Sequence, residues 1–180
     1  MIGWILGPTA SGKSTICYKV IKNLGDGYKC RVGKIPCWIY NDIMVLGRYD
    51  EAGYVLNGLD GVMVSKEEFV EFIDTQQSKY RHIIFEGYKT AFIKKEILDH
   101  LINYDLKIYY LKSPLDITTS RSKHRGNGFD KKLTMKRRLN QYVKLNEIIS
   151  DPYYKDYIVK KDNLNMEQSN RIVDEIVNLL

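Results

Sequence analysis

The stretch from Gly7 to Ser14 has the residue types and the spacing of a loop that holds phosphate groups. It reads G-P-T-A-S-G-K-S and fits the pattern G-x-x-x-x-G-K-[ST] in full. Glycines let the backbone curl so that consecutive N–H groups point at phosphate oxygens, and a following helix adds the positive end of its dipole. We therefore predict a nucleotide-phosphate site made by Gly7, Thr9, Ala10, Ser11, Gly12, Lys13, Ser14 and Thr15.

Two side chains of this loop carry specific chemistry. The Lys13 ammonium is expected to reach the β- and γ-phosphates of ATP, and the Ser14 hydroxyl to ligate Mg²⁺. An apolar run from Ile2 to Leu6 precedes the loop, and a helical pattern from Lys13 to Leu24 follows it. ATP and Mg²⁺ are therefore the expected substrate and cofactor.

Charged residues that could act on a bound phosphate come later in the chain. The predicted strand His82–Phe85 is followed by Glu86, and the carboxyl ends of neighbouring parallel strands meet at one crevice. Glu86 is thus a candidate to hold Mg²⁺ or to accept a proton. Arg121 and Arg125 are four residues apart on one helix face, where two guanidiniums could stabilise charge on a transferring phosphoryl group.

Strand and helix patterns alternate, which predicts a parallel sheet covered by helices on both faces. The expected strands are Ile2–Leu6, Arg31–Tyr40, His82–Phe85, Leu106–Leu111 and Tyr157–Val159. The expected helices are Lys13–Leu24, one from a capping box at Ser65 and Glu68 to about Tyr80, Thr90–Asn103, Ser113–Lys123, Asp130–Ile149 and Met166–Leu180. The fold class is thus α/β, a P-loop NTPase fold with a five-stranded parallel sheet in a single domain over residues 1–180.

Two segments lie outside the regular alternation. Residues 41–64 hold several glycines and no clear period, which predicts an irregular insertion on the acceptor side. Residues 121–130 combine the two arginines with Gly126 and Gly128, which predicts a lid that closes over the site.

The charge distribution favours a polyanionic partner. The net charge is +6, and the segment from Lys107 to Arg138 alone holds ten Lys or Arg against two acidic residues. Such a basic block indicates ATP, a phosphorylated substrate or nucleic acid as the partner. No apolar run approaches the roughly 18 residues that span a bilayer, and no signal-peptide pattern opens the chain. We expect a cytoplasmic protein without a membrane partner.

The three cysteines indicate neither a metal site nor a disulfide framework. Cys17, Cys30 and Cys37 form no CxxC pair and no zinc spacing. We expect reduced thiols that pack as small apolar groups.

The order of these features resembles the nucleoside monophosphate kinase superfamily. The likeness covers nearly the whole chain, from the strand, P-loop and first helix to the R-x-x-x-R lid at Arg121 and Arg125 and a short last strand. In that superfamily the stretch after the last strand touches the adenine, and here it spans residues 160–165. The absence of an N-K-x-D motif argues against a GTPase, and one small domain argues against a helicase.

Three short motifs also resemble phage P-loop kinases that phosphorylate 5-hydroxymethyluracil in DNA. The matching pairs are Gly47 and Tyr49, Gly58 and Asp60, and Glu86 and Gly87. The resemblance implies transfer of the γ-phosphoryl group of ATP to the hydroxymethyl group of the base, in phage DNA hypermodification within the host cytoplasm.

Such an acceptor would need a base and a way to reach the phosphate. A carboxylate within hydrogen-bond reach would orient the hydroxyl and take its proton, and Asp60 is the first candidate for this role. Asp42 is the second, because it follows the strand predicted to end at Tyr40.

A base in a duplex must be extruded to reach the γ-phosphate. The aromatic side chains that could stack on it are Trp38, Tyr40, Tyr49 and Tyr54. The basic side chains that could hold the DNA backbone are Lys131, Lys132, Lys136, Arg137 and Arg138.

Other acceptors stay open. A free deoxynucleoside monophosphate would need arginines for its phosphate, and only Arg48 and Arg81 lie between Asn41 and Glu86. Another alcohol or a polynucleotide end is a further alternative. A nucleotide-dependent switch would show slow hydrolysis without a stable acceptor product.

Overall fold

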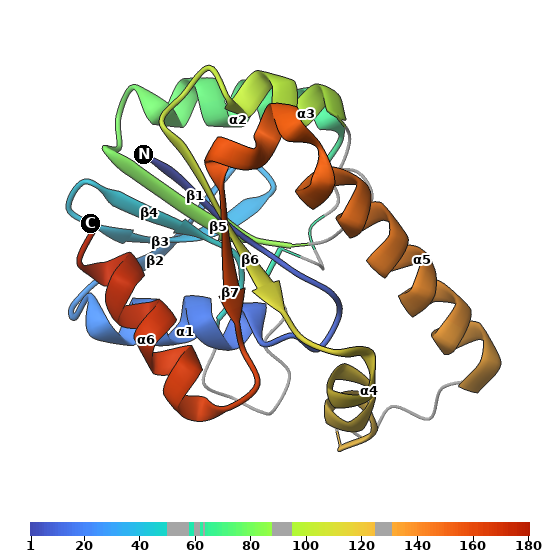
Figure 1. The fold of residues 1–180 in the computed structure, drawn as a ribbon. Helices are drawn as coiled ribbons and strands as arrows, with labels where there is room; N and C mark the ends of the chain where they lie inside the picture. Colours follow the sequence, from blue (N-terminus) through green and yellow to red (C-terminus); the bar gives the residue numbers. More distant parts are fainter. Residues whose placement is uncertain (50–57, 60–61, 63, 88–94, 125–130) are drawn as a thin grey trace.

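The computed structural model describes residues 1–49, 58–59, 62, 64–87, 95–124 and 131–180 (Figure 1). The strands are β1 (Ile2–Leu6), β2 (Tyr28–Val32), β3 (Ile35–Tyr40), β4 (Ile43–Leu46), β5 (His82–Glu86), β6 (Leu106–Lys112) and β7 (Ile158–Asp162). The helices are α1 (Lys13–Asn23), α2 (Lys66–Gln77), α3 (Lys95–Leu101), α4 (Leu115–His124), α5 (Lys131–Ser150), the 3₁₀ helix η1 (Pro152–Tyr157) and α6 (Met166–Val177).

All the described strands belong to one sheet of seven strands, in the order β2-β3-β4-β5-β1-β6-β7. The five strands from β4 to β7 in this order are parallel to one another, and β2 and β3 are added antiparallel at one edge. Because β1 lies in the middle of the parallel part, the loop that follows it opens at the carboxyl edge, between β5 and β6.

The core has two halves, one on each face of the sheet. Trp4 of β1 stacks on Phe85 of β5, which meets Phe69 of α2 edge to face. On the other face, buried side chains of α1 and α6 such as Ile16 and Ile172 pack against Ile5 of β1. Helices α2 and α3 thus cover one face, and α1 and α6 cover the opposite one (Figure 1).

The start of α2 confirms the predicted capping box. The Ser65 hydroxyl accepts a hydrogen bond from the Glu68 amide at 3.1 Å, and the Glu68 carboxylate accepts one from the Ser65 amide at 2.7 Å. Two orphan N–H groups are satisfied, which fixes where the helix begins.

The prediction of a single strand from Arg31 to Tyr40 is wrong, and so is the total of five strands. The chain reverses twice here, at Gly33 with φ +57° and at Asn41 with φ +50°, so that β2, β3 and β4 form an antiparallel meander. Glycine and asparagine are the residues that tolerate this left-handed backbone in tight hairpins. The strand beside β5 is therefore β4, which the sequence placed in an irregular insertion.

Among the described residues, no helix combines the length and the apolar character needed to cross a bilayer.

Candidate nucleotide and phosphoryl-transfer site

The loop between β1 and α1 has the backbone of a phosphate cradle. Ala10 and Gly12 take positive φ values of 66° and 95°, and Gly12 caps the start of α1. The Ser11 amide donates to the Pro8 carbonyl at 3.1 Å, which closes the turn. Left-handed residues in such a loop direct successive N–H groups into one concavity, which suits an anion.

The two glycines of the motif are also required by packing. A Cβ atom on Gly7 would lie 2.7 Å from the Ser11 hydroxyl and 3.1 Å from the Leu111 carbonyl. A Cβ atom on Gly12 would lie 2.6 Å from Nδ2 of Asn163. The loop therefore packs closely against the end of β6 and against Asn163, which follows β7.

Lys13, Ser14 and Glu86 come together at the carboxyl edge of the sheet. Lys13 is 6% exposed, and its ammonium donates to the Pro8 carbonyl within the loop at 3.1 Å. The Ser14 hydroxyl donates to Glu86 Oε1 at 2.9 Å, and Glu86 is fully buried at the end of β5.

The other predicted loop residues have ordinary positions. Thr9 is exposed, and its amide donates to the Gln141 side chain of α5 at 3.2 Å. Thr15 is half-buried in the first turn of α1.

The chemistry of the donors suits Mg²⁺. Hydroxyl and carboxylate oxygens are hard ligands, and Mg²⁺ in proteins usually takes one or two carboxylates together with substrate phosphates and waters. The described residues contain no group of three His, Cys, Asp or Glu side chains that could hold a metal. Ser14 and Glu86 would therefore bind Mg²⁺ together with oxygen atoms of the nucleotide phosphates.

The turn after β4 packs directly on Glu86. Arg48 and Gly58 pair through two backbone hydrogen bonds of 2.9 and 3.1 Å. A Cβ atom on Gly58 would lie 1.6 Å from Glu86 Oε1, and one on Gly47 would lie 2.8 Å from the Gly58 carbonyl carbon. Segments far apart in the sequence thus meet beside Ser14 through glycines that admit no side chain.

Asp60 and Asp42 are the two candidates for the base that takes the proton of the acceptor. Asp60 lies outside the described residues; Leu59 before it and Val62 two residues after it are buried. The carbonyl of Asp42 accepts the amide of His82, the first residue of β5, at 3.1 Å. Asp42 therefore lies at the amino edge of the parallel strands, at the end opposite the phosphate loop, and the prediction for Asp42 is wrong.

Arg121 anchors the segment after β7. Its guanidinium donates to the carbonyls of Asn163 at 3.1 Å and Leu164 at 2.9 Å. Its action on a moving phosphoryl group stays a prediction, as does that of Arg125. Arg125 and the rest of the expected lid, residues 125–130, lie outside the described part of the chain.

Asn163 is a buried residue that connects the phosphate loop to α6, and the sequence analysis did not predict this role. Its Nδ2 donates to the Ser11 carbonyl at 2.6 Å, and its Oδ1 accepts from the Ser169 hydroxyl at 2.6 Å. Its own amide donates to the Lys112 carbonyl at 3.1 Å. The side chain is 1% exposed and ties the phosphate loop to α6. Only its place in the stretch expected near the adenine hinted at a role.

The expected DNA-binding face of α5 is smaller than predicted. Lys136 and Arg137 are exposed, and the side chains of Lys131 and Lys132 lie outside the described part. Arg138 is 5% exposed and donates to the Thr119 hydroxyl of α4 at 3.4 Å, so its prediction as a DNA contact is wrong. Neighbouring helix residues are about 100° apart, so a basic run cannot share one face.

Two of the aromatic candidates for base stacking are buried. Tyr49 is 1% exposed and donates to the Leu46 carbonyl at 3.1 Å. Tyr40 is 4% exposed and stacks on the half-buried Trp38, with ring centroids 6.3 Å apart. Tyr54 lies outside the described residues. The stacking prediction is therefore wrong for Tyr40 and Tyr49.

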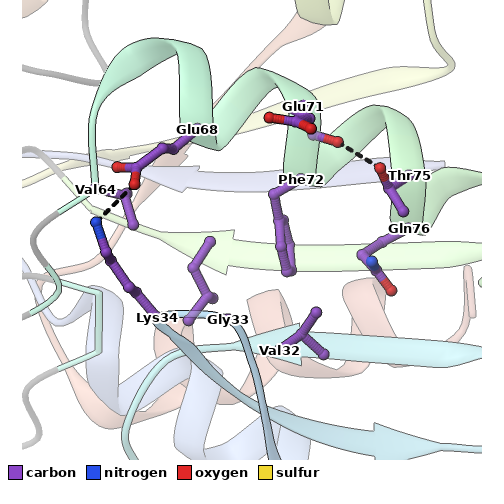
Figure 2. A pocket seen from close by; sticks show the side chains of 10 residues that line it. Val32, Gly33, Lys34, Val64, Glu68, Glu71, Phe72, Thr75 and Gln76 are labelled. Carbon is purple, nitrogen blue, oxygen red and sulfur yellow. Dashed lines mark hydrogen bonds and ion pairs between the residues drawn. The ribbon is translucent and has the colours of Figure 1, made fainter.

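A groove of about 350 Å³ lies between the β2–β3 turn and α2 (Figure 2). Val32 of β2 and Phe72 of α2 line it from opposite sides, and an ion pair of 2.6 Å joins Lys34 and Glu68 across it. None of the predicted phosphate-site residues lines this groove. We therefore do not assign the chemistry to it.

The α/β fold, with its mostly parallel sheet, is similar to the folds of two solved kinases. A gluconokinase from Sinorhizobium meliloti 1021 aligns with a TM-score of 0.52 over 98% of this chain and 93% of its own, at 12% identity. A sugar kinase from Janibacter sp. HTCC2649 aligns with the same TM-score over 98% and 92%, at 13% identity. No protein-family model and no curated protein matches the chain. At these identities the likeness shows the fold alone.

Proposed function

We propose that this chain is an ATP-dependent phosphotransferase that moves the γ-phosphoryl group to a hydroxyl acceptor. The observation that carries the proposal is the contact of Ser14 with the buried Glu86, beside a complete phosphate loop that holds Lys13. The fold, which the chain shares with solved structures of a gluconokinase and a sugar kinase, supports the same class.

The proposed chemistry relies on positioning and charge. Backbone N–H groups of the loop and the Lys13 ammonium hold the β- and γ-phosphates, which fixes the terminal phosphorus for in-line attack. Ser14 and Glu86 would hold Mg²⁺, which would neutralise charge on these phosphates. Burial of Glu86 keeps its carboxylate in a region of low dielectric, where it acts on nearby charges more strongly than in water.

For the acceptor, we propose 5-hydroxymethyluracil in DNA. The three motif pairs behind this resemblance are separate in sequence, yet Gly58 lies against both Gly47 and Glu86 in the fold. Gly58 lies on the carboxylate that contacts Ser14, and Asp60 follows it by two residues as the proposed base. The convergence supports a shared acceptor region next to the phosphates.

DNA would be held by the exposed basic side chains of α5. Lys136 and Arg137 are available for phosphate contacts, and each such contact makes affinity more dependent on salt. The target nucleotide would have to leave the helix stack to reach the phosphate loop.

A second candidate is a small free acceptor, such as a deoxynucleoside monophosphate or a sugar-type alcohol. The burial of Arg138 favours it, because the exposed basic face of α5 is smaller than a DNA partner would lead us to expect. The two solved structures named above are a gluconokinase and a sugar kinase.

The test offers γ-labelled ATP and Mg²⁺ with several acceptors at once. These are duplex DNA containing 5-hydroxymethyluracil, the same duplex with thymine, the free modified nucleotide, thymidylate and gluconate. We expect label in the modified DNA alone, lost in Lys13→Ala and Asp60→Asn and kept in Lys22→Ala, an exposed lysine on the same helix. Label in a free nucleotide or in gluconate would replace the DNA base by the small acceptor.

A further inference from the structure

Two of the three cysteines face each other across the edge hairpin. Cys30 of β2 and Cys37 of β3 are direct partners in the antiparallel register, and their sulfur atoms are 2.9 Å apart. Cys37 is 2% exposed, whereas Cys30 is half-buried on the outermost strand of the sheet.

The register already suits a covalent bond. Directly opposite residues in an antiparallel pair have Cα atoms about 4.5 or 5.5 Å apart, and both separations fall within the range of about 4.4–6.8 Å that disulfides span. Opposite residues also point to the same face of the sheet. The two sulfur atoms can therefore bond without a change of register.

A shared metal ion fits this geometry less well. Two thiolates on one tetrahedral zinc, each at about 2.3 Å, would be roughly 3.8 Å apart. Cys30 and Cys37 are closer than that, at 2.9 Å, and no third ligand completes a metal cluster among the described residues.

We propose that Cys30 and Cys37 form an oxidation site at which a peroxide produces an intrachain disulfide. The Cys30 thiol loses its proton and the thiolate attacks a peroxide oxygen; the O–O bond breaks to give a sulfenic acid and a hydroxide, which takes up that proton and becomes water. The Cys37 sulfur then attacks the Cys30 sulfur, the S–O bond breaks, and a second water leaves. Two thiols and one hydrogen peroxide thus give one disulfide and two waters, with two electrons passing from sulfur to oxygen.

Access decides which thiol reacts first. Cys30 reaches solvent in part, whereas Cys37 is buried, and burial raises the pKa of its thiol and favours the protonated form. Cys17 is fully buried beneath the sheet, and burial raises its pKa as well. Cys17 is therefore an internal control that should not react.

The disulfide would stabilise the part of β3 that pairs with the end of β4 and with the turn after it. Cys37 pairs with Leu46 in the register, and the neighbouring Pro36 carbonyl accepts the Gly47 amide at 2.8 Å. A disulfide that closes so short a loop gives a modest gain, which we expect to appear as a rise of about 5 °C in the melting temperature.

The experiment treats the whole chain with hydrogen peroxide and measures its intact mass, with and without a reductant. We expect a loss of about 2 Da that the reductant reverses. Trypsin without reduction should then release the dipeptide Cys30–Arg31 linked to the peptide 35–48. Cys17→Ser should behave like wild type, and Cys30→Ser and Cys37→Ser should each lose the linked peptide.

The site is independent of the proposed phosphotransferase activity, so neither result bears on the other. An unchanged mass, a crosslink between two chains, a bond to Cys17, or an oxidised form that melts below the reduced one would overturn the proposal.

Discussion

Replacement of Asn163 by alanine tests how the phosphate loop is held. The side chain joins the Ser11 carbonyl to the Ser169 hydroxyl through two hydrogen bonds of 2.6 Å each. Both ends are buried, with Ser11 at 0% and Ser169 at 8% exposure. The change to alanine removes both hydrogen bonds. Because alanine is smaller than asparagine, it introduces no clash with the flanking β7 and α6.

The expected cost follows from the groups left behind. The Ser169 hydroxyl keeps a second acceptor, the Asn165 carbonyl at 3.2 Å, so the loss falls mainly on the Ser11 carbonyl. A buried group without its partner costs about 1–3 kcal/mol. If about 2 kcal/mol of this cost destabilises the loop conformation that binds the nucleotide, the affinity for MgATP drops roughly 30-fold.

The assay is a calorimetric titration of MgATP into wild type, Asn163→Ala and Asn163→Asp. The aspartate has the same shape but places an oxygen against the Ser11 carbonyl, so its affinity should fall at least as far. Asn178→Ala, at the exposed end of α6, is the matched control and should bind like wild type. A folded Asn163→Ala with wild-type affinity would refute the idea that this residue positions the loop.

Three further changes test other parts of the account. Gly58→Ala should abolish phosphoryl transfer, because its Cβ would lie 1.6 Å from Glu86 Oε1, whereas Gly33→Ala, also at positive φ but with nothing within 4 Å, should cost only stability in a thermal melt. Glu86→Gln keeps a hydrogen-bond acceptor for Ser14 but loses the charge, so apparent Mg²⁺ affinity in a transfer assay should fall about 10- to 100-fold. Burial lowers the pKa of His82. Below about pH 6.5 the unfolded chain therefore binds a proton at His82 more readily than the folded chain does, and the free energy of unfolding should decrease as the pH falls. His82→Gln should flatten that slope in urea titrations below about pH 6.5, and an unchanged slope would contradict the assignment.

Local signals were enough to predict the elements around the phosphate loop. Ile2–Leu6, the glycine-rich loop and the helix from Lys13 follow from short-range rules of strands, left-handed glycines and caps. The capping box at Ser65 gave the start of α2 in the same way.

The failures concern pairings between distant residues. The hairpins at Gly33 and Asn41 carry turn residues that can be read, but the pairing of β4 with β5 joins segments about forty residues apart, and no local pattern encodes it. The same holds for the contact of Asn163 with Ser11. The prediction for Arg138 fails because successive side chains of a helix point to different sides, so the basic run cannot lie on one face and Arg138 is buried.

The central claim is that the chain transfers phosphate to an acceptor rather than only hydrolysing ATP. The direct measurement follows γ-labelled ATP in a single turnover with Mg²⁺ and the mixture of hydroxyl acceptors, and separates labelled acceptor from labelled inorganic phosphate. The account predicts labelled acceptor with wild type and none with Lys13→Ala. The substitution removes the ammonium group that donates to the Pro8 carbonyl of the loop. Label found only as inorganic phosphate, at the same rate with and without acceptors, would contradict a phosphotransferase and indicate a nucleotide-dependent switch.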